Sequence, residues 1–194
     1  MNAVHRCIEQ QAASRGTTPA LVTDSGVLSY RDLNARANAV ARHLVARGLR
    51  RGGRVTVSMA PSANLVVTLL GVLKAGGLYL WQPGSSAIPA LAIAVASDGD
   101  EDRYLAIEPQ AMLAEPVAGS PNLPIVVRDT DTACICPSLS GTLVHVPHVS
   151  ITALRASVGG GDVRWSHAEP FDFWVPLMTG ATLTLAHEPV RTAA

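Results

Sequence analysis

The chain has 194 residues and 48% of them are hydrophobic, so it is long enough and apolar enough to bury one large core. Its 15 basic and 15 acidic residues cancel, and this zero net charge argues against nucleic acid or an anionic membrane as the main partner. The three cysteines lack the spacing of a disulfide framework and no signal peptide is evident, so we expect a cytoplasmic protein.

Two helices and a hairpin are predicted before residue 50. Apolar residues at every fourth position predict a helix over residues 4–15. Two short apolar runs on either side of a turn predict a strand–turn–strand hairpin over residues 20–30. Ser29 stands three residues before Asp32, a spacing like that of a capping box, and this predicts the start of a helix that stops at Gly48.

The clearest pattern is a strand, a helix and a second strand within about 30 residues. The β-branched residues at 54–60 predict a buried strand. Ser62 is a residue type that starts helices, and apolar residues on one face predict a helix over residues 65–75. Gly76 and the glycine after it supply the left-handed conformation that ends a helix, and residues 78–81 resume as a strand. Such a crossover places its two strands parallel.

The later elements are shorter. Strands are expected at residues 104–107, 124–127, 134–136 and 180–186. A helix is expected after Pro147, and the acidic residues 98–102 are expected to form a solvated loop, because they lack the spacing of a calcium loop. Apolar strands that alternate with helices predict an α/β fold with a mostly parallel sheet flanked by helices. We expect a single domain over residues 1–194, with a flexible break near residues 159–161.

Four short motifs occur in an order that is typical of one enzyme family. They are residues 28–34 (LSYRDLN), residues 72–79 (VLKAGGLY), residues 147–151 (PHVSI), and a block made of residues 171–172 (FD) and 176–181 (PLMTGA). In these motifs the chain resembles the N-terminal part of the amino-acid adenylation domains of nonribosomal peptide synthetases, which belong to the acyl-adenylate-forming, AMP-binding enzyme superfamily. The resemblance implies the N-terminal subdomain of the adenylate-forming fold.

The resemblance weakens at the loop that wraps the phosphates of ATP. In the family this loop reads Y-T-S-G-S-T-G-x-P-K-G, and its glycines, hydroxyls and lysine contact the phosphates. Here Leu139 stands where a glycine lets the backbone approach the phosphates, and the Pro-Lys-Gly element is absent. The residues that remain as a degenerate phosphate loop are Ser138, Ser140, Gly141 and Thr142. A hydroxyl-rich turn of this kind is also ordinary turn chemistry.

Other features of the family are also reduced. Lys74 is the only lysine in the chain and lies in the crossover helix, whereas the family relies on lysines in its phosphate loop and on its C-terminal lid. Arginine is not interchangeable with lysine in such roles. Asp172 matches the family aspartate that pairs with the α-ammonium group of the substrate, but several pocket residues between it and Pro176 are missing. Because the chain ends before the family's Mg²⁺-binding and lid motifs, we expect a truncated domain without the lid.

Three functions remain open. The first is a degenerate adenylation-like protein without catalytic residues or a cofactor, which serves as a structural or protein-binding partner of synthetase components. The second is the N-terminal half of a split amino-acid-adenylating enzyme, and the third is a nucleotide- or aminoacyl-binding module. ATP and Mg²⁺ are expected only under these two alternatives. The expected partner is a synthetase protein or domain, or a second copy bound through an uncovered apolar face.

Two further groupings do not make convincing sites. His145 and His148 with Cys134 and Cys136 lack the spacing of a zinc site, so no metal is predicted. Ser138 with His148 resembles a hydrolase pair, but the sequence has no G-x-S-x-G elbow. No uninterrupted apolar run reaches roughly 18 residues, so no membrane-spanning helix is predicted.

Overall fold

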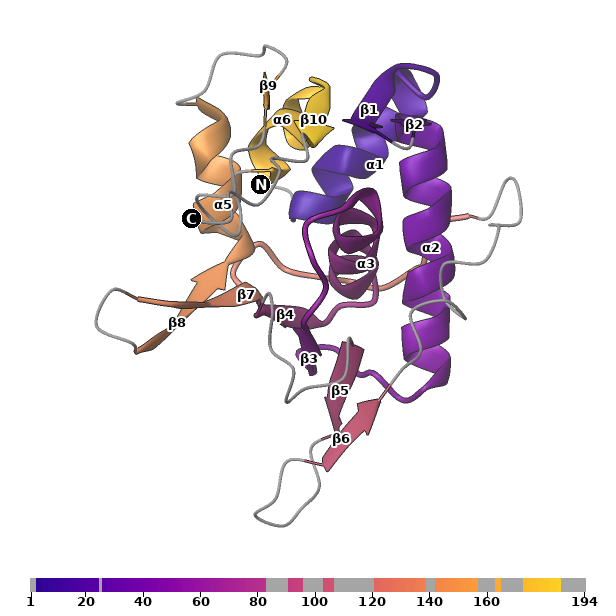
Figure 1. The fold of residues 1–194 in the computed structure, drawn as a ribbon. Helices are drawn as coiled ribbons and strands as arrows, with labels where there is room; N and C mark the ends of the chain where they lie inside the picture. The colour runs from indigo at the N-terminus through magenta and orange to yellow at the C-terminus, as the bar shows by residue number, and fades with distance from the viewer. Residues whose placement is uncertain are drawn as a thin grey trace, which may run out of the picture.

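The computed structural model describes residues 3–24, 26–82, 91–95, 103–106, 121–138, 142–156, 163–164 and 173–185 (Figure 1). The acidic loop predicted at residues 98–102 and the break predicted at residues 159–161 lie outside these ranges. Within the described ranges, helices pack beside two β-sheets, so the predicted α/β class is confirmed.

The elements come in the following order along the chain. The helices are α1 (Val4–Ser14), α2 (Tyr30–Ala46), α3 (Ala63–Lys74), α5 (His148–Ala153) with a 3₁₀ turn at Leu154–Ala156, and α6 (Trp174–Thr179). A four-stranded sheet has the order β2-β1-β10-β9 and consists of β1 (Pro19–Thr23), β2 (Gly26–Ser29), β9 (Val163–Arg164) and β10 (Leu183–Leu185). A six-stranded sheet has the order β6-β5-β3-β4-β7-β8 and consists of β3 (Arg54–Val57), β4 (Leu78–Trp81), β5 (Leu91–Val95), β6 (Arg103–Ala106), β7 (Thr132–Pro137) and β8 (Leu143–Pro147).

The N-terminal elements form where the local sequence predicted them. The hairpin consists of β1 and β2, which pair antiparallel. Ser29 is the N-cap of α2, and its hydroxyl oxygen accepts the backbone N–H of Asp32 at 3.2 Å. Gly48 follows the helix with a φ of +96°, a left-handed conformation that glycine adopts without strain. Both ends of α2 were therefore predictable from local residues.

The predicted crossover is confirmed as β3, α3 and β4. The two strands are parallel, with Val55 opposite Tyr79. The Ser62 hydroxyl accepts the backbone N–H of Leu65 at 3.2 Å and begins α3, and Gly76, at a φ of +76°, follows its end.

The sheets are mixed, which corrects the expectation of mostly parallel pairing. Parallel pairs join β3 with β4, β4 with β7, β1 with β10 and β10 with β9. Antiparallel pairs join β3 with β5, and also β5 with β6, β7 with β8 and β1 with β2. The last three pairs join strands that follow one another in the sequence, and such short connections favour antiparallel hairpins.

The strand predicted at residues 124–127 is not a strand. Residues 121–128 run extended across the helices, and their side chains alternate between exposed and partly buried (Figure 1). The segment is held by side chains instead of a strand ladder: Arg6 Nη2 donates to the carbonyl of Ile125 at 3.1 Å, and Arg42 donates to the carbonyl of Pro121. The apolar run at residues 124–127 thus predicted a strand that is not formed, because the neighbours of this segment are helices.

Helix α3 lies at the centre of the core, between α2 and the β3–β4 pair (Figure 1). All its residues from Leu65 to Lys74 are buried. Beside it, Tyr30 donates its hydroxyl hydrogen to the backbone carbonyl of Ala181 (2.7 Å), and Trp174 Nε1 donates to the hydroxyl of Tyr79 (2.8 Å). None of the helices in the described ranges combines the length and apolarity needed to cross a membrane.

Candidate functional site

The predicted phosphate loop lies at the tip of the β7–β8 hairpin, which projects from the body of the molecule (Figure 1). The ladder reaches Pro137 opposite Leu143, and the next backbone hydrogen bond runs from the N–H of Ser138 to the carbonyl of Thr142 at 2.8 Å. Ser138 and Thr142, which flank the predicted loop, therefore close the hairpin. The N–H of Ser138 is donated within the chain, so it is not directed at a ligand as phosphate-loop amides are. Leu139, Ser140 and Gly141 lie outside the described residues.

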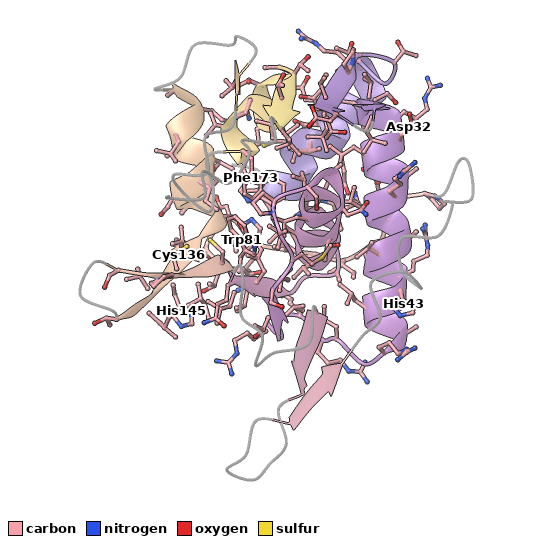
Figure 2. All side chains as sticks on the ribbon, in the orientation of Figure 1. Asp32, His43, Trp81, Cys136, His145 and Phe173 are labelled. Atoms are coloured by element: carbon pink, nitrogen blue, oxygen red, sulfur yellow. The ribbon has the colours of Figure 1, made fainter. Side chains whose placement is uncertain are left out.

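The predicted substrate residue, Asp172, also lies outside the described residues, and its role stays a prediction. Phe173, which follows it, is fully buried and is the N-cap residue of α6 (Figure 2). The chain next to Asp172 is thus anchored in the core by an aromatic side chain.

Lys74, the only lysine in the chain, lies within the described residues, in contrast to Asp172. The side chain of Lys74 is 1% exposed at the end of α3, and it forms an ion pair with Glu9 of α1. Its Nζ also donates to Oδ1 of Asn34 at 2.9 Å and to Oδ1 of Asn122 at 3.2 Å. Burial lowers the pKa of Lys74 to about 8, although the neighbouring Glu9 acts in the opposite direction. The ammonium group therefore joins α1, α2, α3 and the extended segment 121–128.

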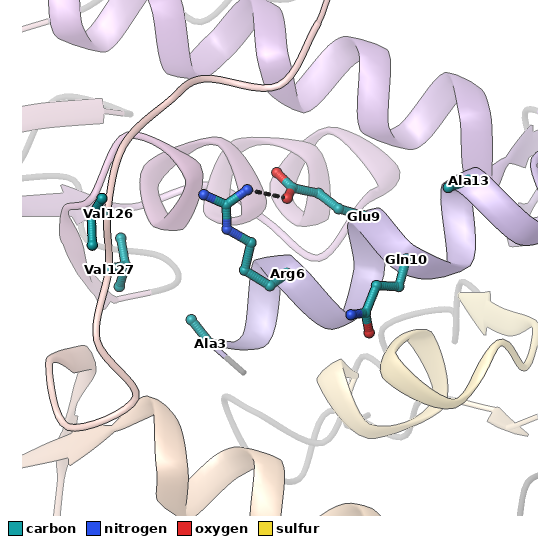
Figure 3. Close-up of a pocket in the computed structure, with 7 residues that line it drawn as sticks. All are labelled: Ala3, Arg6, Glu9, Gln10, Ala13, Val126 and Val127. Atoms are coloured by element: carbon teal, nitrogen blue, oxygen red, sulfur yellow. Dashed lines mark hydrogen bonds and ion pairs between the residues drawn. The ribbon is translucent and has the colours of Figure 1, made fainter. Parts of the chain in front are cut away.

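An open groove lies on the other side of Glu9 and was not predicted (Figure 3). Its volume is about 480 Å³, and it is lined by Ala3, Arg6, Glu9, Gln10, Ala13, Val126 and Val127. Arg6 Nη1 contacts Glu9 Oε2 at 2.9 Å, so the two charged groups of the lining neutralise each other. Among the described residues of the lining, the one side chain that could act as a general base is Glu9, and its carboxylate is already paired with Arg6 and Lys74. No pattern in the sequence predicts this groove, because residues 121–128 are far from α1 along the chain.

The four possible zinc ligands, which are Cys134, Cys136, His145 and His148, do not lie together in the structure. Cys134 and Cys136 are buried on β7 with their sulfur atoms 3.7 Å apart, whereas His145 lies opposite Ile135 and so on the other face of the sheet (Figure 2). His148 is buried after β8, where its Nδ1 accepts the N–H of Val4 at 3.3 Å and burial lowers its pKa to about 4. Within the described ranges, no group of three or more metal-ligating side chains comes together.

The Ser138 and His148 pairing is also not formed. Ser138 lies at the tip of the hairpin, and His148 lies beyond the far end of β8, next to α1. The length of the whole strand therefore separates the hydroxyl from the imidazole.

Comparison with known protein families assigns the chain to one of them. The AMP-binding enzyme family matches residues 8–107, which include most of α1, all of α2, the β3–α3–β4 crossover and Lys74. The chain belongs to the AMP-binding enzyme family.

Peptide synthetases are among the curated relatives of this AMP-binding family member. Surfactin synthase subunit 2 of Bacillus subtilis (strain 168) is 38% identical over 104 residues, which are 54% of this chain and 3% of the synthase. Gramicidin S synthase 1 of Brevibacillus brevis is 29% identical over 148 residues, 76% of this chain and 13% of the synthase. Malpibaldin synthetase of Mortierella alpina is 27% identical over an alignment that covers 98% of this chain and 4% of the synthetase. The chain thus spans a small part of each relative.

Solved structures agree on the fold of this family member. NpsA–ThdA, an artificially fused adenylation–PCP di-domain from Klebsiella oxytoca, has a TM-score of 0.79 at 18% identity, over 97% of this chain and 40% of that one. The NpsA N-terminal subdomain in complex with 3-hydroxyanthranilyl-AMSN has a TM-score of 0.77 at 18% identity and covers 97% of this chain and 54% of that one. The predicted fold, the N-terminal subdomain of an adenylation domain, is confirmed.

Proposed function

We propose that this adenylation-domain-like chain does not activate amino acids by itself and serves as a structural or protein-binding partner of synthetase components in a nonribosomal peptide pathway. The observation that carries the proposal is the burial of Lys74, the only lysine in the chain.

The chemistry of adenylate formation explains why the burial of Lys74 supports the proposal. Formation of an acyl-adenylate develops negative charge on phosphate and carboxylate oxygens, and enzymes stabilise such charge with positioned cations. An ammonium group has three N–H donors. In Lys74 these face three acceptors, Glu9, Asn34 and Asn122. No donor of the ammonium group is left for a substrate, and the group is shielded from solvent.

The hairpin supports the same proposal. A phosphate loop binds through backbone N–H groups that point at the ligand. The N–H of Ser138 is donated to Thr142 instead, and the strand that follows is exposed, with neither lysine nor arginine from Leu143 to Pro147. The sequence from Ser138 to Pro147 thus contains neither lysine nor arginine, whereas the family has a lysine in this loop.

Amino-acid-dependent exchange between ATP and pyrophosphate tests the proposal. We expect the purified chain, with Mg²⁺ and a panel of amino acids and aryl acids, to show no exchange above a protein-free blank. Lys74→Met is expected to give the same result, while an intact adenylation domain assayed in parallel shows exchange. Exchange by the chain alone would overturn the proposal, and exchange that appears only after co-expression with another chain would instead support the split enzyme.

A second candidate, a binding module without catalysis, is favoured by one comparison. The NpsA N-terminal subdomain, of which this chain covers 54%, is in complex with 3-hydroxyanthranilyl-AMSN. If this chain binds similar molecules, that compound or ATP will raise its melting temperature in a saturable way, because a ligand that binds only the folded state stabilises it. An unchanged melting temperature at millimolar ATP and at high concentrations of the AMSN compound would exclude this second candidate.

A further inference from the structure

A second pocket lies between the β1–β2 hairpin and the helices α2 and α3, where the hairpin meets the beginning of α2 (Figure 1). Its volume is about 170 Å³. An apolar cavity of roughly 150 Å³ is large enough for a benzene ring, so this pocket can hold a body of that size. Most of its described lining is apolar and comes from the hairpin and from α3: Leu21, Val27, Leu28, Ala63 and Val67.

Arg36 brings an unpaired positive charge to this apolar lining. It lies on α2 and is partly buried, and its Nε is shielded from solvent without a hydrogen-bond partner. Among the described residues, none forms an ion pair or a hydrogen bond with its guanidinium group. Asp32, one helical turn earlier, has the spacing of an ion-pair partner, but its Oδ2 accepts the hydroxyl of Ser29 at 2.6 Å. A buried donor without an acceptor is costly, and a bound anion would satisfy it.

The beginning of α3 adds to the positive character of the pocket. Ala63 and Asn64 are the first two residues of this helix, and both line the pocket. The hydroxyl and the carbonyl of Ser62 accept the N–H groups of Leu65 and Val66, whereas the N–H groups of Ala63 and Asn64 have no acceptor among the described residues. The exposed side chain of Asn64 offers further N–H donors. No acidic side chain is among the described lining residues, so a guanidinium group and a helix N-terminus meet there without a counter-charge.

We propose that this pocket binds a small monocarboxylate with an apolar body, with its carboxylate on Arg36 and its body between β2 and α3. A planar carboxylate matches the guanidinium fork and accepts two of its N–H groups. Phosphate or sulfate fits less well, because its remaining oxygens would be desolvated against apolar walls without donors. The inference goes beyond the proposed function, since none of the residues assigned to the phosphate loop or to substrate binding is among the described lining.

An NMR titration of the ¹⁵N-labelled full chain with sodium benzoate tests the proposal, with sodium chloride at the same concentration as the reference. We expect saturable shifts of the backbone amides of Leu28, Asn64 and Val67, with a dissociation constant of about 1 mM or lower. Benzamide has the same ring without the charge, and inorganic phosphate has charge without the ring, so each should bind at least about tenfold more weakly. Equal binding of benzamide, tighter binding of phosphate, or absence of saturable shifts with benzoate would each overturn the proposal.

Two variants connect the binding to Arg36. Arg36→Gln should raise the dissociation constant of benzoate at least about tenfold, while Arg47→Gln, an exposed position at the end of the same helix, should leave it unchanged. Asn64→Asp keeps the test valid if Arg36→Gln folds poorly, because Asn64 is exposed and an acidic residue is favourable in the first turn of a helix.

The carboxylate introduced by Asn64→Asp should repel benzoate and compete for Arg36, so it should also weaken binding at least about tenfold. Unchanged affinity in either folded variant contradicts the site. The titration reports on benzoate binding and pyrophosphate exchange reports on catalysis, so either proposal can fail without the other.

Discussion

Replacing Glu9 with glutamine is expected to lower the free energy of unfolding by about 3 kcal/mol, as happens when one partner of a buried ion pair is removed. The side chains of Glu9 and Lys74 are 8% and 1% exposed, so the ammonium group would keep its burial and lose its counter-charge. Urea denaturation followed by circular dichroism at pH 6 measures the loss. Arg51→Gln is the matched control, because it breaks an exposed ion pair with Asp131 and should cost about 1 kcal/mol or less.

The pH dependence separates the charge of Lys74 from its packing. Its pKa is about 8 in the folded protein, below the usual 10.5, so the unfolded chain binds more protons between these values and stability from this group rises with pH there. Relative to Lys74→Met, the wild type should therefore gain stability between about pH 8 and 10.5. The comparison with this variant is needed because burial raises the pKa of Tyr79 and of the Cys7 thiol, and these groups act in the opposite direction. A constant difference between the two proteins over this range would contradict the charged, buried state of Lys74.

Replacing Gly71 with alanine is expected to destabilise the protein by about 2 kcal/mol, although alanine favours helices over glycine. A Cβ at this position in α3 would lie 2.6 Å from Cβ of Val40 and would also overlap its Cγ1, while the carbonyl of Ala37 is 3.2 Å away. The helices α2 and α3 approach each other closely only because residue 71 has no side chain. Thermal and urea denaturation of the variant measure the effect.

The double variant Val40→Ala with Gly71→Ala identifies the cause. If overlap with Val40 is responsible, shortening that side chain should recover most of the loss, so the two changes will not be additive. An additive double variant would indicate that the loss comes from elsewhere, for example from the contact with the backbone of α2.

The buried cluster also explains why the only lysine is structural. Glu9, Asn34 and Asn122 belong to α1, α2 and the segment 121–128, and Lys74 contacts all three. Withdrawal of the ammonium group toward a ligand would break contacts with each of these elements. The contacts that Lys74 makes with these elements are therefore also the reason to expect that it does not assist the formation of an acyl-adenylate.

Much of the local structure was determined by the sequence alone. Ser29 and Ser62 predicted the starts of two helices and Gly48 and Gly76 their ends, because caps and left-handed glycines act within a few residues of each other. The order of the motifs was sufficient to predict the adenylation-domain fold, which the comparisons confirm. The loss of the phosphate-loop glycine and of its lysine could likewise be read directly from the residues.

Only the tertiary structure decided which residues meet. The partners of Lys74 are 65, 40 and 48 positions away, and no local pattern relates such distant residues. Residues 124–127 had the pattern of a strand but lie against helices, and the strand β8 had not been predicted from the sequence at all. Side-chain periodicity specifies the conformation of a segment, whereas its neighbours depend on long-range packing, which a single sequence does not display.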